Sequence, residues 1–247
     1  MKLKFSRGNA KLDALEKYVK GQVWTFSLLS GHSCPYAKDC KSQVEIVNGK
    51  RQVVDGPHTK WRCFSASQEA LFTNVYNSRN HNMEIVKVAA TDIPLAAKII
   101  ADSLPRKAKV VRIHVGGDFA TKAYFQAWIL VAHENPNVIF YAYTKSLPFW
   151  KWAKDNGILP DNLVLTASYG GWKDAMIASE GFKSALVVMS EDEAKLLDLP
   201  IDHDDSLAVS NGKSFALLLH GTQPKGSEAA KALKKLNGKG TYGRGSK

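Results

Sequence analysis

Apolar strands and amphipathic helices alternate along most of this 247-residue chain. Continuous apolar runs predict buried strands at residues 23–29, 109–115, 137–143, 163–168, 184–189 and 214–219. Between them, residues 121–133 carry apolar side chains at helical spacing, and shorter helices are expected at 148–156, 173–179, 190–199 and 227–236. The pattern is that of repeated strand–helix units.

This alternation favours an α/β fold in which helices cover a parallel sheet. We expect a partial (β/α)6-type barrel of parallel strands that forms a single α/β domain over residues 1–247. The Asn48-Gly49 pair lies between two alternating runs, so residues 42–60 are predicted to form a β-hairpin insertion. Residues 238–247 are rich in glycine and basic side chains and are predicted to be a flexible tail.

A further helix is expected at residues 65–76. The polar residues 77–82 follow it and are interpreted as a loop or an anion-binding segment. Sequence alone does not separate these two alternatives.

Polar residues and glycines follow the predicted strands. Gly116, Gly117 and Asp118 come after one strand, Lys145 after the next, and Ser168 closes the one after that. Because the carboxyl ends of parallel strands meet at one edge of a sheet, we expect these residues to surround one pocket. Ordinary turns also use glycine, and an aspartate in this place can simply cap a helix. Lysine is seldom buried without a partner, which makes the strand-end lysine the stronger signal.

The chain contains three cysteines, with the spacing Cys-x5-Cys-x22-Cys. Cys34 and Cys40 lie in a polar loop after the first predicted strand, and Cys63 follows the hairpin. An odd number of cysteines excludes a fully paired disulfide framework. Three thiolates can hold three irons of a four-iron, four-sulfur (4Fe–4S) cluster and leave the fourth iron open for a ligand.

Other interpretations of the cysteines remain. Free cysteines are often small buried apolar residues, and the two that flank the loop could form a disulfide that leaves Cys63 alone. Zinc is the main alternative metal, with His32 or His58 as a fourth ligand. Tyr36, inside the cysteine loop, is expected to cover the cluster, and His114 is expected to be an interior histidine.

The formal net charge of +11 indicates an anionic partner, such as nucleic acid or a phosphorylated molecule. No apolar run approaches the roughly 20 residues that cross a bilayer, so no membrane partner is expected. The sequence shows no secretory signal, and a reducing host cytoplasm is the expected location, where disulfides are rare.

Several segments together resemble the phage family called gene product 88. They are residues 4–12, Cys34-Pro35-Tyr36-Ala37 with Cys40, residues 112–119 and residues 140–146. The resemblance extends over nearly the whole chain. It implies a viral or prophage origin and assigns no activity.

A second, looser resemblance is to radical S-adenosylmethionine enzymes, which have a partial (β/α)6 barrel and a three-cysteine loop after the first strand. Their glycine-rich motif after the second strand contacts the methionine part of the cofactor, and Gly116-Gly117-Asp118 occupies the equivalent place. The cysteine spacing here differs from the usual one. The resemblance implies S-adenosylmethionine as a cofactor, with Gly116, Gly117, Asp118, Lys145 and Ser168 around it.

Two functional hypotheses follow. The first is a phage-encoded, radical S-adenosylmethionine-like enzyme with a three-cysteine 4Fe–4S cluster. The alternative is a non-catalytic iron–sulfur or zinc protein that binds nucleic acid or a host factor. An open iron site and a polar rim favour the first, whereas a histidine as fourth ligand would favour the second.

Overall fold

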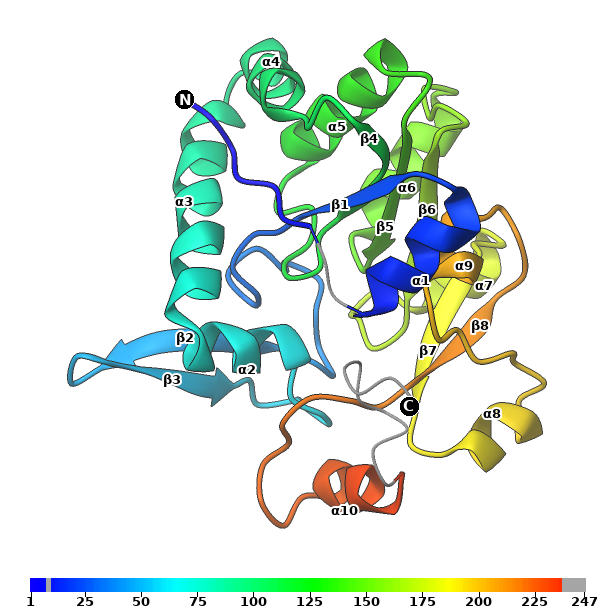
Figure 1. Cartoon of the computed structure of the whole chain (residues 1–247). Helices are drawn as coiled ribbons and strands as arrows, with labels where there is room; N and C mark the ends of the chain where they lie inside the picture. The colour runs from blue at the N-terminus through cyan, green and yellow to red at the C-terminus, as the bar shows by residue number, and fades with distance from the viewer. Residues whose placement is uncertain (8–9, 237–247) are drawn as a thin grey trace.

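The computed structural model describes residues 1–7 and 10–236, and six parallel strands form its central sheet. Their order is β1-β4-β5-β6-β7-β8, and the sheet curls into half a barrel (Figure 1). The strands are β1 (Gln22–Phe26), β4 (Ala108–Ile113), β5 (Ile139–Thr144), β6 (Leu163–Ser168), β7 (Ser184–Val188) and β8 (Phe215–Leu218). Each was predicted within a few residues. The tail predicted at residues 238–247 lies outside the described residues.

Helices cover the outer face of the sheet. They are α3 (Thr73–Ala89), α4 (Ile93–Ser103), α5 (Lys122–Glu134), α6 (Leu147–Asp155) and α7 (Ala175–Ser179). Trp128 of α5 is fully buried, and its ring meets Phe26 of β1 and Phe140 of β5 edge-on. Alternate strand residues point outward into this core, because side chains along a strand alternate between its two faces.

Two short helices cover part of the inner face. They are α1 (Ala10–Val19) and α9 (Ser206–Val209), which lie in front of the sheet in Figure 1. Leu15 of α1 and Val209 of α9 belong to the same core as Val110, Tyr141 and other inward-facing strand residues. At the far edge, α8 (Glu191–Leu196) and α10 (Glu228–Lys235) pack against β7 and β8.

The predicted hairpin is present as an antiparallel pair, β2 (Ser42–Val47) and β3 (Lys50–Asp55), which projects from the barrel in Figure 1. Asn48 and Gly49 both have positive φ, 51° and 73°, as a two-residue primed turn requires. Helix α2 (Phe64–Leu71) packs against both hairpin strands. The hairpin thus separates the second cysteine from the third along the chain.

The region after the hairpin differs from the prediction. The expected helix at residues 65–76 is two helices, because Phe72 between them has an extended backbone (φ −109°, ψ 109°). The polar residues 77–82 are therefore not a loop but the middle of α3. Helices α1, α4 and α9 were not predicted. In the described part of the chain, no helix is long and apolar enough to cross a membrane.

A buried carboxylate joins α9 to the inner face of the sheet. Asp205, at the start of α9, is fully buried and has a left-handed backbone (φ 64°). Its oxygens accept hydrogen bonds from Arg112 at 2.7 Å, from Tyr141 at 2.8 Å and from Tyr143 at 2.9 Å. Burial and the nearby carboxylate raise the pKa of both tyrosines, so they act as hydrogen-bond donors at neutral pH.

We expect Asp205→Ala to lower the free energy of unfolding by about 3 kcal/mol, because it leaves the Arg112 charge without its buried partner. Urea denaturation followed by circular dichroism measures the loss. The exposed Asp161, replaced by alanine in the same way, is the matched control and should change stability by less than about 0.5 kcal/mol. Equal stabilities of the two variants would contradict the structural role given to this carboxylate.

Candidate cluster and cofactor site

A cavity of about 810 Å³ opens at the carboxyl ends of the strands. The three cysteines and all five residues predicted to surround a cofactor line it, although they come from five separate segments. They are Cys34, Cys40, Cys63, Gly116, Gly117, Asp118, Lys145 and Ser168. The predicted convergence of strand ends on one pocket is therefore present in the structure.

The floor of the cavity is a row of inward-facing strand residues. Thr25, Arg112, Tyr143 and Leu217 lie two positions beyond the row that α1 and α9 cover. Thr25 pairs with Arg112 across β1 and β4, which makes the floor continuous from strand to strand. Strand residues two positions apart share a face, so the row beneath α1 and α9 and the row that forms the cavity floor both point inward.

The hairpin brings Cys63 back to the cysteine loop. Its first residue, Ser42, pairs with its last, Asp55, so the chain leaves the hairpin where it entered. The Cys63 amide then donates to the Ser42 hydroxyl at 3.2 Å, and Cys63 becomes the residue before α2. Cys63 therefore lies close to the cysteine loop, although 22 residues separate it from Cys40 along the chain.

The three thiols are close enough to influence one another's ionisation. Burial and the charges of Asp118, Cys63 and Cys40 raise the pKa of Cys34 far above its usual value. Burial and the Cys40 thiolate raise the pKa of Cys63 to about 11. Mutual repulsion of thiolates is relieved when they bind positively charged metal, which holds them deprotonated. The three thiols therefore lie within electrostatic reach of one another at the cavity.

The histidines considered as fourth ligands have other contacts. A ring nitrogen of His32 lies 3.0 Å from the carbonyl oxygen of Val44, and His58 meets Trp172 edge-on. Within residues 1–7 and 10–236, no three His, Cys, Asp or Glu side chains form a group that could hold a metal ion, so the metal centre stays a prediction. Tyr36 packs against Phe149 and is not among the residues that line the cavity.

His114 is an interior histidine, as predicted. A ring nitrogen lies 3.0 Å from the Tyr124 hydroxyl, and Phe119 meets the ring edge-on. Burial lowers the pKa of His114 to about 3, so it is neutral at physiological pH.

The two glycines pack tightly against the protein itself. A Cβ on Gly116 would lie 2.3 Å from the Ser65 hydroxyl and 2.9 Å from a guanidinium nitrogen of Arg79. Gly117 has φ of 90°, and a Cβ there would lie 2.5 Å from the Ser33 hydroxyl. Any side chain at either position would displace the cysteine loop or α2, so the glycine turn is required by this packing.

Asp118 and Lys145 form one polar unit beside the cysteines. The buried Asp118 carboxylate accepts hydrogen bonds from the Thr144 hydroxyl at 2.6 Å and from the Lys145 amide at 2.8 Å. Burial raises the pKa of Asp118, and these hydrogen bonds oppose that shift. Lys145 is only 9% exposed, and its ammonium group donates to the Ser168 hydroxyl at 2.6 Å.

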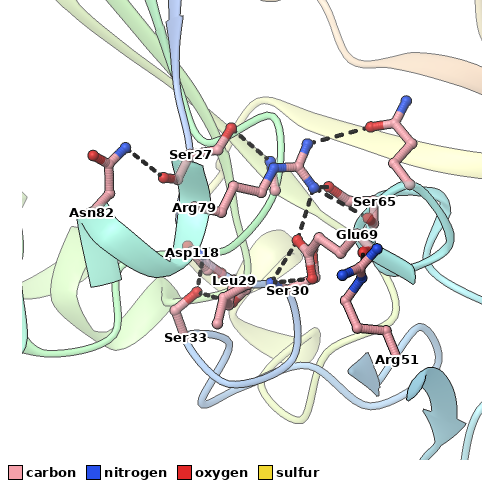
Figure 2. Close-up of polar contacts among 12 residues, drawn as sticks. Ser27, Leu29, Ser30, Ser33, Arg51, Ser65, Glu69, Arg79, Asn82 and Asp118 are labelled. Carbon is pink, nitrogen blue, oxygen red and sulfur yellow. Dashed lines mark hydrogen bonds and ion pairs between the residues drawn. The ribbon is translucent and has the colours of Figure 1, made fainter. Parts of the chain in front are cut away.

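A buried ion pair that the sequence analysis missed supports the cysteine loop (Figure 2). Glu69 of α2 is fully buried and accepts hydrogen bonds from the amide of Ser30, at 3.0 Å, and from Arg79 of α3, at 2.7 Å. Arg79 also donates to the Ser65 hydroxyl at 2.6 Å. Arg79 lies in the polar run 77–82, but neither its helical placement nor its partner can be read from that run.

The family comparison agrees with the resemblance seen in the sequence. A family model described as Gene product 88 matches residues 3–237. The chain belongs to this family. The Gene 88 protein of Mycobacterium phage L5 is 36% identical over 90 residues, which are 34% of this chain and 38% of the phage protein. The chain therefore spans well under half the length of that curated relative.

These matches support the prediction of a phage protein. No solved structure matches the chain. The resemblance to radical S-adenosylmethionine enzymes finds no counterpart in the comparisons, so it stays a hypothesis that depends on the geometry of the site.

We expect Glu69→Gln to loosen the cysteine loop, because it leaves the Arg79 charge uncompensated and weakens the acceptor for Ser30. Hydrogen–deuterium exchange of residues 30–40 should become faster, and the protein should lose about 3 kcal/mol of stability. Glu84 is the matched control: it also pairs with a cation of α3, but at the surface, so Glu84→Gln should leave exchange in the loop unchanged. If hydrogen exchange of residues 30–40 is unchanged in both variants, Glu69 does not stabilise the cysteine loop.

Proposed function

We propose that this phage protein is an iron–sulfur enzyme of the radical S-adenosylmethionine type, built on a (β/α)6-type half barrel. In this proposal Cys34, Cys40 and Cys63 hold a 4Fe–4S cluster, and S-adenosylmethionine binds beside it. The single observation that carries the proposal is the convergence of three thiols and the glycine turn on one cavity at the strand ends.

The donor set suits a cluster better than a single zinc ion. Structural zinc usually has four protein ligands within about 2.3 Å of one point, whereas cluster thiolates bind separate irons. The chain offers three thiols, and the contacts of His32 and His58 direct their rings elsewhere. Three thiolates leave one iron without a protein ligand, which is the position a small-molecule ligand would take.

The residues near the cysteines suit the methionine part of S-adenosylmethionine. Lys145 supplies a buried positive charge for its carboxylate, and Ser168 orients the ammonium group. Asp118 has its oxygens engaged by Thr144 and Lys145, so we assign it the role of positioning the lysine segment. Gly116 and Gly117 line the cavity, and the absence of side chains there lets a ligand approach the main chain.

When bound and reduced, such a cluster supplies the electron that breaks a carbon–sulfur bond of S-adenosylmethionine. The protein's own part is to exclude water, to hold the thiolates and to orient the ligand. We place this activity in the reducing cytoplasm of the host, where the three thiols stay free of disulfides. The alternative of a non-catalytic protein that binds nucleic acid or a host factor is less favoured, because the predicted residues line a cavity suited to a small molecule.

Protein purified without oxygen should be brown and contain about four irons per chain. Serine in place of Cys34, Cys40 or Cys63 should remove most of the iron and the visible absorption. Thr91→Ala is the control, because Thr91 is exposed just after α3, and this variant should retain the cluster. Iron and zinc analysis decides the outcome: stoichiometric zinc without iron, or full iron in a cysteine variant, would refute the cluster.

S-adenosylmethionine should alter the electron paramagnetic resonance signal of the reduced cluster and, with excess reductant, release 5′-deoxyadenosine. Lys145→Gln should weaken binding roughly tenfold while leaving the iron content intact, because it removes a charged hydrogen-bond donor. Lys87→Gln, at an exposed site on α3, is the control. An unchanged resonance signal at saturating S-adenosylmethionine would show that the cofactor assignment is wrong.

A further inference from the structure

The cavity wall is strongly basic, although the molecule contains many acidic residues. The cations in the wall are Lys4, Arg7, Arg62, Arg79, Arg112 and Lys145. Among the described residues that line it, Asp118 supplies the only carboxylate. The residues that line the cavity therefore include more cations than carboxylates.

The acidic partners of four of these cations are not part of the cavity lining. Each of four arginines has a carboxylate partner within 2.7 Å: Arg7 with Glu16, Arg62 with Asp55, Arg79 with Glu69 and Arg112 with Asp205. None of these four carboxylates is among the residues that line the cavity. The ion pairs hold the arginines in place and offset much of their charge, but they leave cations rather than carboxylates in the cavity lining. A concave surface lined by cations concentrates oppositely charged ligands.

Three of the cations belong to one continuous part of the wall. The N-terminal segment pairs with β1 through Ser6 and Thr25, and Thr25 is the β-sheet neighbour of Arg112. Asn82 of α3 holds the same segment by two hydrogen bonds to the backbone of Lys4, at 2.8 and 2.9 Å. We call Lys4, Arg7 and Arg112 the basic wall.

We propose that the substrate of this enzyme carries a phosphate or a carboxylate group, and that this group binds at the basic wall. The inference rests on the proposed function, because it names the substrate class of the same cavity. Arginine is suited to both groups, since its planar donors match two oxygens at once. Phe64 and the exposed Phe72 also line the cavity, so an apolar or aromatic part of the substrate can pack against their rings.

The position of these cations favours a small molecule over a nucleic acid strand. Nucleic acid binding needs a run of exposed cations along a surface. In the basic wall Lys4 and Arg7 are exposed, but the Arg112 side chain is only 13% exposed and lies in the cavity floor. A cavity of about 810 Å³ is within the usual range for small-molecule sites, about 300–1,000 Å³. Binding of an oligonucleotide is therefore treated as an outcome that would overturn the proposal.

Calorimetric titration of the purified full-length protein at low ionic strength tests the proposal with four probes. Glycerol 3-phosphate and succinate represent the two anionic groups, glycerol is the neutral control, and a single-stranded oligonucleotide represents nucleic acid. We expect one of the two small anions to bind and glycerol not to bind. The preferred anion identifies whether the substrate is phosphorylated or carboxylated.

Variants locate the binding. Arg112→Gln should weaken the preferred anion roughly tenfold, since it removes a charged hydrogen-bond donor. The Arg112 variant also removes the partner of the buried Asp205, so a second variant is needed. Lys4 is exposed, and Lys4→Gln should weaken binding of the preferred anion several-fold without disturbing the fold. Lys87→Gln is the matched control and should leave binding unchanged.

Three results would overturn the proposal. The first is that neither anion binds. The second is that the preferred anion binds Lys4→Gln and Arg112→Gln as tightly as it binds the wild type. The third is that only the oligonucleotide binds. Iron content measured on the same samples separates this inference from the proposed function. Protein that holds a cluster but binds no anion refutes only the substrate class, whereas protein without iron that binds anions at the basic wall refutes only the cluster enzyme.

Discussion

The buried Glu69 carboxylate connects the segments from which the candidate ligands project. It accepts from Ser30 in the loop that leads to Cys34, and its own helix begins directly after Cys63. Its partner Arg79 lies against Gly116, so α2, α3, the cysteine loop and the glycine turn share one set of polar contacts. A fully buried charge must be paired, and that requirement fixes these segments relative to one another.

A second constraint divides the inner face of the half barrel. Helices α1 and α9 cover the first inward-facing row of the strands, and Asp205 ties α9 to the sheet through Arg112 and two tyrosines. The next row toward the strand ends lines the cavity and forms its floor. The same arginine thus takes part in the support of the fold and in the basic character of the cavity.

Much of the fold and the site could be predicted because the signals are local. The apolar runs and their helical partners indicated the order of strands and helices, and Asn48-Gly49 indicated the hairpin. Parallel strand ends meet at one edge, so Gly117, Lys145 and Ser168 could be placed together. The prediction failed for α3, because polar side chains such as Arg79 and Asn82 bind distant partners that a local pattern does not reveal.

The sequence by itself determined the strand–helix alternation, the number of cysteines and the residues at the strand ends, since each depends on near neighbours along the chain. Only the tertiary structure decided that Glu69 pairs with Arg79, that Asp205 supports Arg112, and that these acidic partners are not part of the cavity lining. It also showed that Gly116 and Gly117 are demanded by packing against Ser65 and Ser33. These features join residues far apart in the chain, and burial, which makes an unpaired charge or a displaced side chain costly, selects them.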